Sequence, residues 1–593
     1  MSDLNDLPRS HDVTDPTTCA WPAQEIAAAE APVTAGTDRY MRAAAHAVAR
    51  AALRELRQGA GTVGTQTGPG WISGAPVLLL VGGGHNGADT LLAGSLLAHS
   101  GCAVSAVLAT EHPHPVALEE ARGHGVTIHG AGYRSDDGTG QDSAEAMAAI
   151  EAFLVHGGLV LDGLTGIGAT GALRPAAAAL IAPLIAAGEP GRRPLRVIAV
   201  DLPSGTGVDD GTVNGPVLAA DHTVTFTCLK GCQCLPPARH LCGVVEVVPL
   251  GLPAPTSRPL ARRPVDGALG DYLTRAVGEP GPGDHKYTRG VVGLWAGSES
   301  YPGAAVLAAS GAVRAGAGMV RLSAPRRVED LVLAARPEVV PTAGRVQALV
   351  LGPGIDPADT TRADEVRAVL ASTLGPCGKD QQCPTRIPTV VDAGALSILA
   401  QLLTEDLSCT PLHVLTPHAG EAAALLSALE AKETPAQETR RWSRERVEAH
   451  PGLAARELCR LTGATVLLKG ATTLIAAPQR PLVSVDGGPG WMASAGSGDV
   501  LAGILGAVLA GAAARWEQGA PDASGPDPVL DALVDSVAAG VRLHALAGAY
   551  AAASPQGAGE AGVGGHPIAA LDIAVALGPA RLELNRLQAV PHA

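Results

Sequence analysis

A run of small residues stands directly before an acidic residue and a long apolar stretch. Gly496, Ser497 and Gly498 precede Asp499, and the alanine- and leucine-rich residues that follow predict a helix starting here. Backbone N–H groups at a helix start favour anions, and glycine lets an anion approach them closely. Asp499 is then either a cap of this helix or a base beside a transferring phosphoryl group.

Polar side chains also follow three apolar runs in the first half of the chain. Asn86 lies in a glycine-rich turn, Asp162 and Asp201 each end a run, and Ser204 follows Asp201. The runs are typical of buried parallel strands, and ligands bind outside the carboxyl ends of such strands. Carboxylate, amide and hydroxyl oxygens gathered there suit a cation or a polar, phosphorylated ligand.

The elements that would position these residues form one long alternation of strands and helices with a single interruption. Strand-like runs separated by alanine-rich segments predict a doubly wound α/β sheet over about residues 60–250. Residues 251–284 are dense in proline and glycine and predict a linker. The alternation then restarts and predicts a second α/β domain over 285–585, with insertions near residues 380, 440 and 520.

Length and composition favour a globular protein with two or more domains. The chain has 593 residues, 46% of them hydrophobic and 17% charged, and a net charge of −14 without a basic stripe. Nothing in this pattern attracts nucleic acid or an anionic membrane. The N-terminus lacks an apolar segment, and the apolar stretches are shorter than the roughly 20 residues of a membrane span. We therefore expect a cytoplasmic protein.

Four of the ten cysteines, Cys228, Cys232, Cys234 and Cys242, lie close together in the sequence. Their spacing lacks a paired C-x-x-C motif, so we interpret them as small hydrophobic residues rather than as zinc ligands. Most other cysteines are isolated, and disulfides are not expected in a reducing compartment.

The motifs of the first half resemble, in their order, the YjeF N-terminal family of NAD(P)H-hydrate epimerases. That family has N-N-G-G-D, D-x-x-x-G-T-G, V-D-x-P-S-G and A-D-x-T-V-T-F, and this chain has HNGAD, DGLTGIG, VDLPSG and ADHTVTF. The resemblance implies a Rossmann-like epimerase domain over residues 20–250, with Asp162 as a catalytic residue and potassium bound by Asn86, Asp162 and Ser204. It also implies contacts to the hydrated nucleotide from His85, Asn86, Gly87, Ala88, Asp89, Gly166, Ile167, Gly168, Ala169, Thr170, Gly171, Ala172 and Asp201.

Two departures from this family pattern stand in the first motif. His85 replaces an asparagine, and Ala88 adds a Cβ where the family has glycine and backbone approaches a phosphate. The alternative to an active epimerase is therefore a domain that binds a nucleotide, or supports its neighbour, without turnover.

The motifs of the second half resemble, in their order, the ribokinase-like NAD(P)H-hydrate dehydratases. They are AGSESYPGA, ALVLGPGID, VVDAGAL, LTPHAGE, LLKGATT and GWMASAGSGDV. The resemblance implies an α/β/α sandwich over residues 285–585 that uses ADP, or alternatively ATP. It favours Asp499 as the catalytic base over a helix cap, with Gly496, Ser497 and Gly498 as the anion hole.

The same resemblance implies the binding residues of the dehydratase. Contacts to the hydrated substrate fall on Ala304, Gly354, His418 and Asp499. Contacts to ADP or AMP fall on Lys469, Gly470, Ala471, Thr472, Thr473 and Gly498. Gly394 stands where the family has a second aspartate, which leaves Asp392 as the candidate Mg²⁺ ligand on that strand.

Together, the two resemblances cover nearly the whole chain and imply a bifunctional repair enzyme. Its substrates would be the R- and S-hydrates of NADH and NADPH, its ions K⁺ and Mg²⁺, and its co-substrate ADP or ATP. A ribokinase-fold kinase for a small alcohol is the alternative for the second half, and the fused first domain argues against it. We expect a homo-oligomer.

Overall fold

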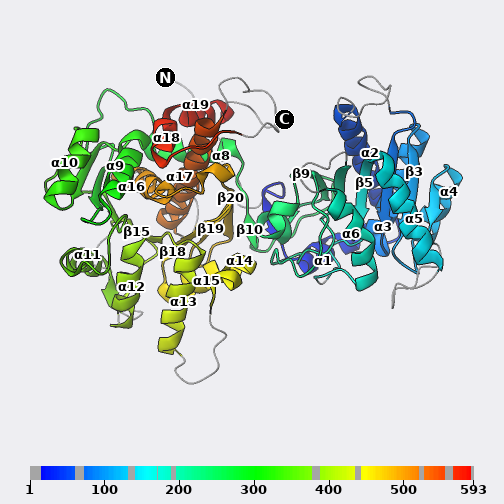
Figure 1. Ribbon diagram of the computed structural model, residues 1–593, viewed down its shortest axis with the longest axis horizontal. Coiled ribbons are helices and arrows are strands. Elements are labelled where there is room, and N and C mark those ends of the chain that lie inside the picture. The colour runs from blue at the N-terminus through cyan, green and yellow to red at the C-terminus, as the bar shows by residue number, and fades with distance from the viewer. Residues whose placement is uncertain are drawn as a thin grey trace. The chain divides into compact units, whose positions relative to one another are not determined.

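The computed structural model describes residues 15–59, 72–130, 141–169, 171–188, 195–376, 387–405, 407–433, 442–519, 527–553 and 565–588. The chain divides into two compact units, Val13–Arg262 and a second unit that begins at Arg263. Each unit is built on its own sheet of strands with helices packed against it (Figure 1).

The first unit contains a fully parallel seven-stranded sheet in the order β4-β3-β2-β5-β6-β7-β9. Successive side chains of β2 point to opposite faces: Leu79 and Val81 pack against α2, α3 and α4, whereas Leu78 and Leu80 pack against α5 and α6. The predicted doubly wound fold is therefore confirmed. The strands are β2 (Pro76–Val81), β3 (Ala103–Leu108), β4 (Thr127–His129), β5 (Gly158–Gly163), β6 (Leu195–Val200), β7 (His222–Phe226) and β9 (Val244–Val248). The helices are α2 (Arg39–Gly59), α3 (Gly84–His99), α4 (Pro115–Gly123), α5 (Gln141–His156) and α6 (Pro175–Ala187).

Short elements complete this unit and hold the clustered cysteines. They are β1 (Cys19–Trp21), α1 (Ala23–Thr34), β8 (Leu229–Lys230), α7 (Gly231–Cys234), the 3₁₀ helix η1 (Ala238–Leu241) and β10 (Ala261–Arg262). Cys228 packs with Cys19 and Trp21, and Cys232 packs with Leu202 and other apolar side chains. Within the described ranges, no group of three or more His, Cys, Asp or Glu side chains has the arrangement of a metal site.

The second unit has a mixed sheet in the order β12-β11-β13-β15-β17-β18-β19-β20, in which the first six strands are parallel and the last two antiparallel. The strands are β11 (Val291–Trp295), β12 (Met319–Ser323), β13 (Ala348–Leu351), β15 (Thr389–Val391), β17 (His413–Leu415), β18 (Thr465–Leu468), β19 (Thr472–Ala476) and β20 (Leu482–Asp486). A separate two-stranded ribbon consists of β14 (Gly375–Pro376) and β16 (Leu407–Ser408).

Two groups of helices accompany this sheet. A core joins it to α8 (Asp266–Val277), α9 (Pro302–Ala315), α10 (Arg326–Ala335), α16 (Ser497–Glu517), α17 (Pro528–Ala552), α18 (Ala570–Val575) and α19 (Leu577–Gln588). The other group consists of α11 (Thr360–Thr373), α12 (Gly394–Thr404), α13 (Ala419–Glu433), α14 (Arg444–Ala449) and α15 (Pro451–Thr462) (Figure 1).

Part of the stretch expected to be a linker is instead a helix of the second unit. Within 251–284, Asp266–Val277 forms α8, which buries Leu269 and Leu273 in the core shared with α16 and α17. The helix is only 12 residues long, and the prolines and glycines on both sides of it made the whole stretch resemble a linker. The insertions near 380, 440 and 520 fall mainly on residues outside those described.

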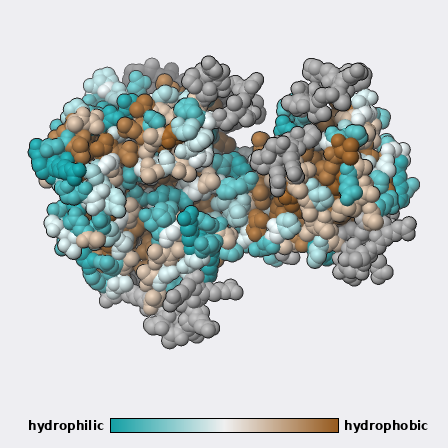
Figure 2. Space-filling view, viewed as in Figure 1, coloured by the Kyte–Doolittle hydropathy of each residue, from teal (hydrophilic) through white to brown (hydrophobic). Residues whose placement is uncertain are grey.

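Helix α16 is the central helix of the second unit. Two glycines allow α9 and α16 to pack in close contact. A Cβ at Gly311 of α9 would lie 2.4 Å from Val500 O, and a Cβ at Gly503 of α16 would lie 2.0 Å from Ala308 O. By length and composition α16 alone among the described helices resembles a membrane span, but 89% of its apolar window is buried inside the fold. Hydrophilic and hydrophobic residues intermingle on the visible face of this unit (Figure 2). We therefore interpret α16 as a core helix.

Candidate active sites

The first unit contains a cavity of about 600 Å³ beside the carboxyl ends of β2, β5 and β6. This is the edge of the sheet where the sequence predicts the ligand site. The predicted contacts that line it are His85, Asn86, Asp89, Gly166, Ile167, Gly168, Ala169 and Asp201. Gly87, Ala88, Gly171 and Ala172 are not among its lining residues, and Thr170 lies outside the described residues.

The position of Ala88 differs from the expectation that it faces a phosphate. Ala88 is fully buried in the core between α3 and the sheet. The neighbouring Gly87 makes the close backbone approach instead, since a Cβ there would lie 2.0 Å from Gly82 O. The substitution of alanine for glycine at position 88 therefore adds a core methyl group and leaves the cavity unchanged.

Ala88→Gly is accordingly expected to leave epimerisation unchanged and to lower stability by about 1 kcal/mol, because glycine weakens a helix interior. The matched control is Ala93→Gly, which removes another fully buried methyl group from α3. Denaturant unfolding and epimerisation rates of both variants check this expectation. A selective change in the epimerisation rate of Ala88→Gly would place residue 88 back at the ligand.

Asn86, Asp162 and Ser204, predicted to bind potassium, converge beside this cavity. Asp162 accepts hydrogen bonds at Oδ1 from Ser204 Oγ (2.7 Å) and at Oδ2 from Ser204 N (2.9 Å). Thr165 N donates to Ser204 Oγ at 2.9 Å, and Asn86 Nδ2 donates to Thr165 O at 2.6 Å. Burial raises the pKa of Asp162, while the bonds from Ser204 and Leu164 oppose this rise.

The amide oxygen of Asn86 is the atom that tests whether a cation fits here. Asn86 Oδ1 is buried and has no hydrogen-bond donor within the described part of the chain. A buried oxygen without a donor is costly unless something else satisfies it, and oxygen ligands are those that hard cations prefer. The residues present therefore fit a monovalent cation.

A buried ion pair that sequence reasoning missed closes the other side of the cavity. Lys230 Nζ donates to Asp201 Oδ1 (2.6 Å), Thr225 Oγ1 (2.8 Å) and Phe226 O (2.9 Å), and Lys230 is only 2% exposed. Asp201 has φ 69°, a left-handed conformation that is uncommon outside glycine. Lys230 is one of five lysines in the chain, and this rarity was the one available signal.

Asp89 lies in the same cavity without such a partner. Its Oδ1 is buried without a hydrogen-bond partner in the described ranges. Burial, and then the nearby Asp201 carboxylate, raise the pKa of Asp89 well above its ordinary value. The cavity thus holds one carboxylate that is paired with a cation, Asp201, and one whose pKa is raised, Asp89.

In the second unit, α16 begins where the sequence predicts an anion hole. Gly496 precedes the helix with φ 89°, which glycine adopts without strain. A side chain at Gly498 would begin 3.6 Å from Lys469 Nζ, so the predicted nucleotide-binding lysine lies against the first helical turn. An ammonium group and unpaired helix N–H groups together make a site for a phosphoryl group.

Lys469 is held by two carboxylates, one directly after β15 and one in the first turn of α13. Its Nζ donates to Asp392 Oδ1 at 2.8 Å and lies 3.7 Å from Glu421 Oε2. Burial opposes the charge of Lys469, but Asp392, Glu421 and Asp499 raise its pKa above the ordinary value. Thr416, which donates to Asp392 Oδ1 at 2.7 Å, and Glu421 were not among the predicted site residues.

The surroundings of Asp499 differ from those of a helix-capping side chain. Gly496, at the N-cap position, has no side-chain cap, and no described hydrogen bond joins the Asp499 carboxylate to the helix N–H groups. Burial, and then the Asp392 carboxylate, raise the pKa of Asp499 to about 6, against the opposing effect of Lys469. A carboxylate with a pKa near neutrality is suited to proton transfer.

Two of the predicted hydrate contacts, Ala304 and Gly354, adjoin each other, and a third, His418, is linked to Lys469 through Glu421. Gly354 has φ 65°, and a Cβ there would lie 2.5 Å from Ala304 Cβ, so the two positions adjoin. His418 Nδ1 accepts from Gly420 N (3.0 Å) and Glu421 N (3.3 Å), which places the ring hydrogen on Nε2 as a donor. His418 N donates to Glu421 Oε2 at 2.9 Å, which links it to Lys469.

Asp392, the candidate Mg²⁺ ligand, is engaged at one carboxylate oxygen. Its Oδ1 accepts from Thr416 and Lys469. An aspartate in place of Gly394 would not fit this backbone, because a Cβ there would lie 2.2 Å from Ile355 O. Mg²⁺ at this strand end stays a prediction.

The predicted nucleotide segment 469–473 forms the turn between β18 and β19. Lys469, Gly470 and Ala471 make the turn, and Thr472 and Thr473 are buried in β19.

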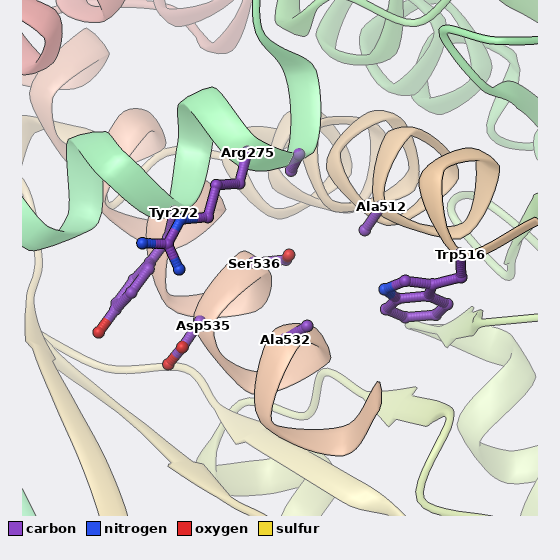
Figure 3. A pocket seen from close by; sticks show the side chains of 8 residues that line it. Tyr272, Arg275, Ala512, Trp516, Ala532, Asp535 and Ser536 are labelled. Atoms are coloured by element: carbon purple, nitrogen blue, oxygen red, sulfur yellow. The ribbon is translucent and has the colours of Figure 1, made fainter. Parts of the chain in front are cut away.

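A second hollow of about 20 Å³ between α8, α16 and α17 is lined by Tyr272, Trp516 and neighbouring residues (Figure 3). It has room for one water molecule and not for a nucleotide.

Comparisons with known proteins match each half of the chain to a family. The family described as YjeF-related protein N-terminus matches residues 37–232, and the family described as NAD(P)H-hydrate dehydratase matches residues 292–560. The bifunctional NAD(P)H-hydrate repair enzyme of Mycobacterium leprae is 39% identical over 476 residues, which are 79% of this chain and 84% of that protein. Its Mycobacterium tuberculosis counterpart is 39% identical over 493 residues, 82% of this chain and 88% of that protein.

A solved structure is similar to the second unit at lower identity. It is the ADP/ATP-dependent NAD(P)H-hydrate dehydratase of Bacillus subtilis, co-crystallized with ATP and Mg²⁺. The two are 21% identical, the match covers 53% of this chain and 97% of that chain, and the TM-score is 0.36. On the evidence of its two domains and its full-length relatives, this chain belongs to the family of bifunctional NAD(P)H-hydrate repair enzymes.

Proposed function

We propose that the second unit dehydrates the S-hydrates of NADH and NADPH at the expense of ADP or ATP. The observation that carries this proposal is the convergence of Asp499 and Lys469 on the first turn of α16. A carboxylate, an ammonium group and the N–H groups of Gly498 and Asp499 at one helix start support phosphoryl transfer at this position. Positioning and charge stabilisation of this kind account for most phosphoryl-transfer catalysis.

The reaction follows from these groups. The oxygen of the C6 hydroxyl forms a bond to the terminal phosphorus of the nucleotide, and Asp499 accepts the hydroxyl proton. ADP leaves when the nucleotide is ATP, and AMP leaves when it is ADP. Lys469 and the N–H groups of Gly498 and Asp499 in the first turn stabilise the charge on the transferring group. Elimination then breaks the C6–O bond, releases phosphate and a ring proton, and restores NADH or NADPH.

For the first unit we propose interconversion of the R- and S-hydrates in the cavity beside β2, β5 and β6. Its support is the lining by Asp89, whose pKa burial raises well above its ordinary value, and by Asp201, which pairs with Lys230. Asp162, which accepts from Ser204, is the third carboxylate that we propose acts there. Potassium held by Asn86, Asp162 and Ser204 would supply a fixed positive charge for the polar substrate. A domain that binds a nucleotide without turnover is the alternative.

The ligand contacts predicted for the remaining residues are part of this proposal. In the first unit these include His85, Gly166 and Gly168, and in the second Ala304, Gly354 and His418. No step is assigned to Mg²⁺, since Asp392 is engaged by Lys469. A homo-oligomer and a cytoplasmic location remain predictions.

The test is recovery of NADH, followed at its near-ultraviolet absorbance, from a mixture of R- and S-hydrates with ADP or ATP. Full recovery is expected, because the S form is dehydrated and the R form is continually converted to it. Recovery that stops when the S form is exhausted would contradict the epimerase proposal. No recovery with either nucleotide would contradict the dehydratase proposal.

The pH dependence of dehydration follows from the pKa of Asp499. Below a pH of about 6 this carboxyl is protonated and has no capacity to accept the substrate proton. We therefore expect kcat/KM for dehydration to fall as the pH decreases through about 6 and to be level above it, because kcat/KM reports groups of the free enzyme. A profile level from pH 5 to 8, or one that rises with acid, would contradict this role.

A further inference from the structure

His544 of α17 is the one buried histidine in contact with the anion hole among the described residues. It is 8% exposed, and its Nε2 lies 3.1 Å from Ser497 O and 3.3 Å from Ser497 Oγ. Nothing in the sequence motifs singled it out, because it stands 47 residues after Ser497 on a different helix.

The geometry fixes which nitrogen carries the hydrogen. Ser497 O is a carbonyl oxygen and accepts only, so His544 Nε2 must be the donor. The same Nε2–H of His544 also faces Ser497 Oγ, so the hydroxyl oxygen is an acceptor in this contact. The hydroxyl hydrogen of Ser497 is consequently left for another acceptor, such as a phosphoryl oxygen.

The ring has no charge at neutral pH. Burial is the main reason why the pKa of His544 decreases to about 4, and the nearby Lys469 ammonium contributes to this decrease. His544 therefore acts as a hydrogen-bond donor of fixed direction and adds no charge to the phosphoryl site.

A second contact from the same face of α17 supports the loop before the anion hole. Gly548 is four residues after His544, one helical turn away, and a Cβ there would lie 2.0 Å from Met492 Sδ. Met492 ends the 3₁₀ helix η2 (Gly490–Met492), which leads into Gly496. Helix α17 thus contacts the segment 490–497 at two points. Gly548 packs against Met492, and His544 donates a hydrogen bond to Ser497.

We propose that His544 is a positioning residue of the dehydratase: its Nε2–H holds the carbonyl and hydroxyl of Ser497 and thereby aims the first turn of α16 at the transferring phosphoryl group. This inference rests on the proposed dehydratase function. It assigns α17 a role in the reaction that the substrate-contacting motifs do not include.

Two amides of different length test the proposal. In His544→Gln the side-chain nitrogen takes the place of Nε2, whereas in His544→Asn it takes the place of Nδ1 and does not reach Ser497. We expect His544→Asn to lower kcat for dehydration by about 10²-fold with little change in KM, as displacement of a catalytic group by about 1 Å does. His544→Gln should restore most of this loss. Both variants should unfold at similar temperatures.

The matched control is His413, a buried histidine whose pKa burial also lowers to about 4 and whose Nε2 contacts Thr373 Oγ1 at 3.0 Å. His413→Gln should lower stability and leave kcat unchanged. Equal kcat for His544→Asn and His544→Gln, or losses that follow the unfolding temperature, would reduce His544 to a structural residue. Because wild-type dehydration is measured in parallel, failure of the function itself would be recognised separately.

Imidazole ¹⁵N NMR of the wild-type protein gives a readout that does not depend on a variant that folds. We expect the neutral Nε2–H tautomer for His544, with a shift of this signal when ADP is added. An Nδ1–H tautomer, or a signal unchanged by saturating ADP, would overturn the proposal.

Discussion

Asp499→Asn is expected to lower kcat for dehydration by about 10²- to 10⁴-fold, the usual contribution of a positioned base. Asparagine keeps the shape of the side chain but has no capacity to take the C6 hydroxyl proton. Because the Asp499 carboxylate makes no described hydrogen bond that holds the helix, stability should not decrease. Stopped-flow recovery of NADH from the pure S-hydrate measures this effect.

The matched control is Asp359→Asn. Asp359 caps α11 through a bond from Arg362 N at 3.2 Å, and asparagine is an equally good cap. This variant should retain wild-type activity and stability. If Asp499→Asn and Asp359→Asn dehydrated the substrate at similar rates, Asp499 would have only a structural role at the start of α16.

Lys230→Met is expected to lower the stability of the first unit by about 3–5 kcal/mol, because it leaves the buried Asp201 carboxylate without its cation. Epimerisation should be lost with it, since Asp201 lines the cavity. The double variant Lys230→Met/Asp201→Asn should regain much of the stability, because both charges are removed together. Asparagine tolerates the left-handed backbone at position 201 and still accepts from Thr225 Oγ1.

Denaturant unfolding of the full chain, with each variant compared in a double-mutant cycle, measures this coupling. Lys286→Met is the control, because Lys286 is exposed and its removal should change stability by less than about 0.5 kcal/mol. Additive effects of the Lys230 and Asp201 substitutions would show that the ion pair contributes nothing beyond its separate parts.

The sequence predicted the sheets and the strand ends beside which the candidate site residues lie, because those features depend on local pattern. Apolar runs that end in Asp162 or Asp201 marked strands whose carboxyl ends meet in space. The glycines before Asp499 likewise marked the start of α16. Both are read from a few consecutive residues.

Features that depend on side-chain direction or on distant pairing were not predictable in this way. The bond between Lys230 and Asp201 joins residues 29 apart, and that between Lys469 and Asp392 joins residues 77 apart. The direction of Ala88 depends on the residue at which α3 begins, and a shift of one position would have turned it to the cavity. Helix α8 was missed because tertiary packing, rather than its flanking residues, stabilises it.

The central claim is that phosphoryl transfer to the C6 hydroxyl, with Asp499 as base, drives the dehydration. The most direct test measures inorganic phosphate and NADH together during conversion of the S-hydrate with ADP or ATP. The mechanism predicts one phosphate released for each NADH formed, and formation of both products slowed together by about 10²- to 10⁴-fold in Asp499→Asn. NADH formation without nucleotide cleavage, or coupled formation of both products by Asp499→Asn at the wild-type rate, would contradict it.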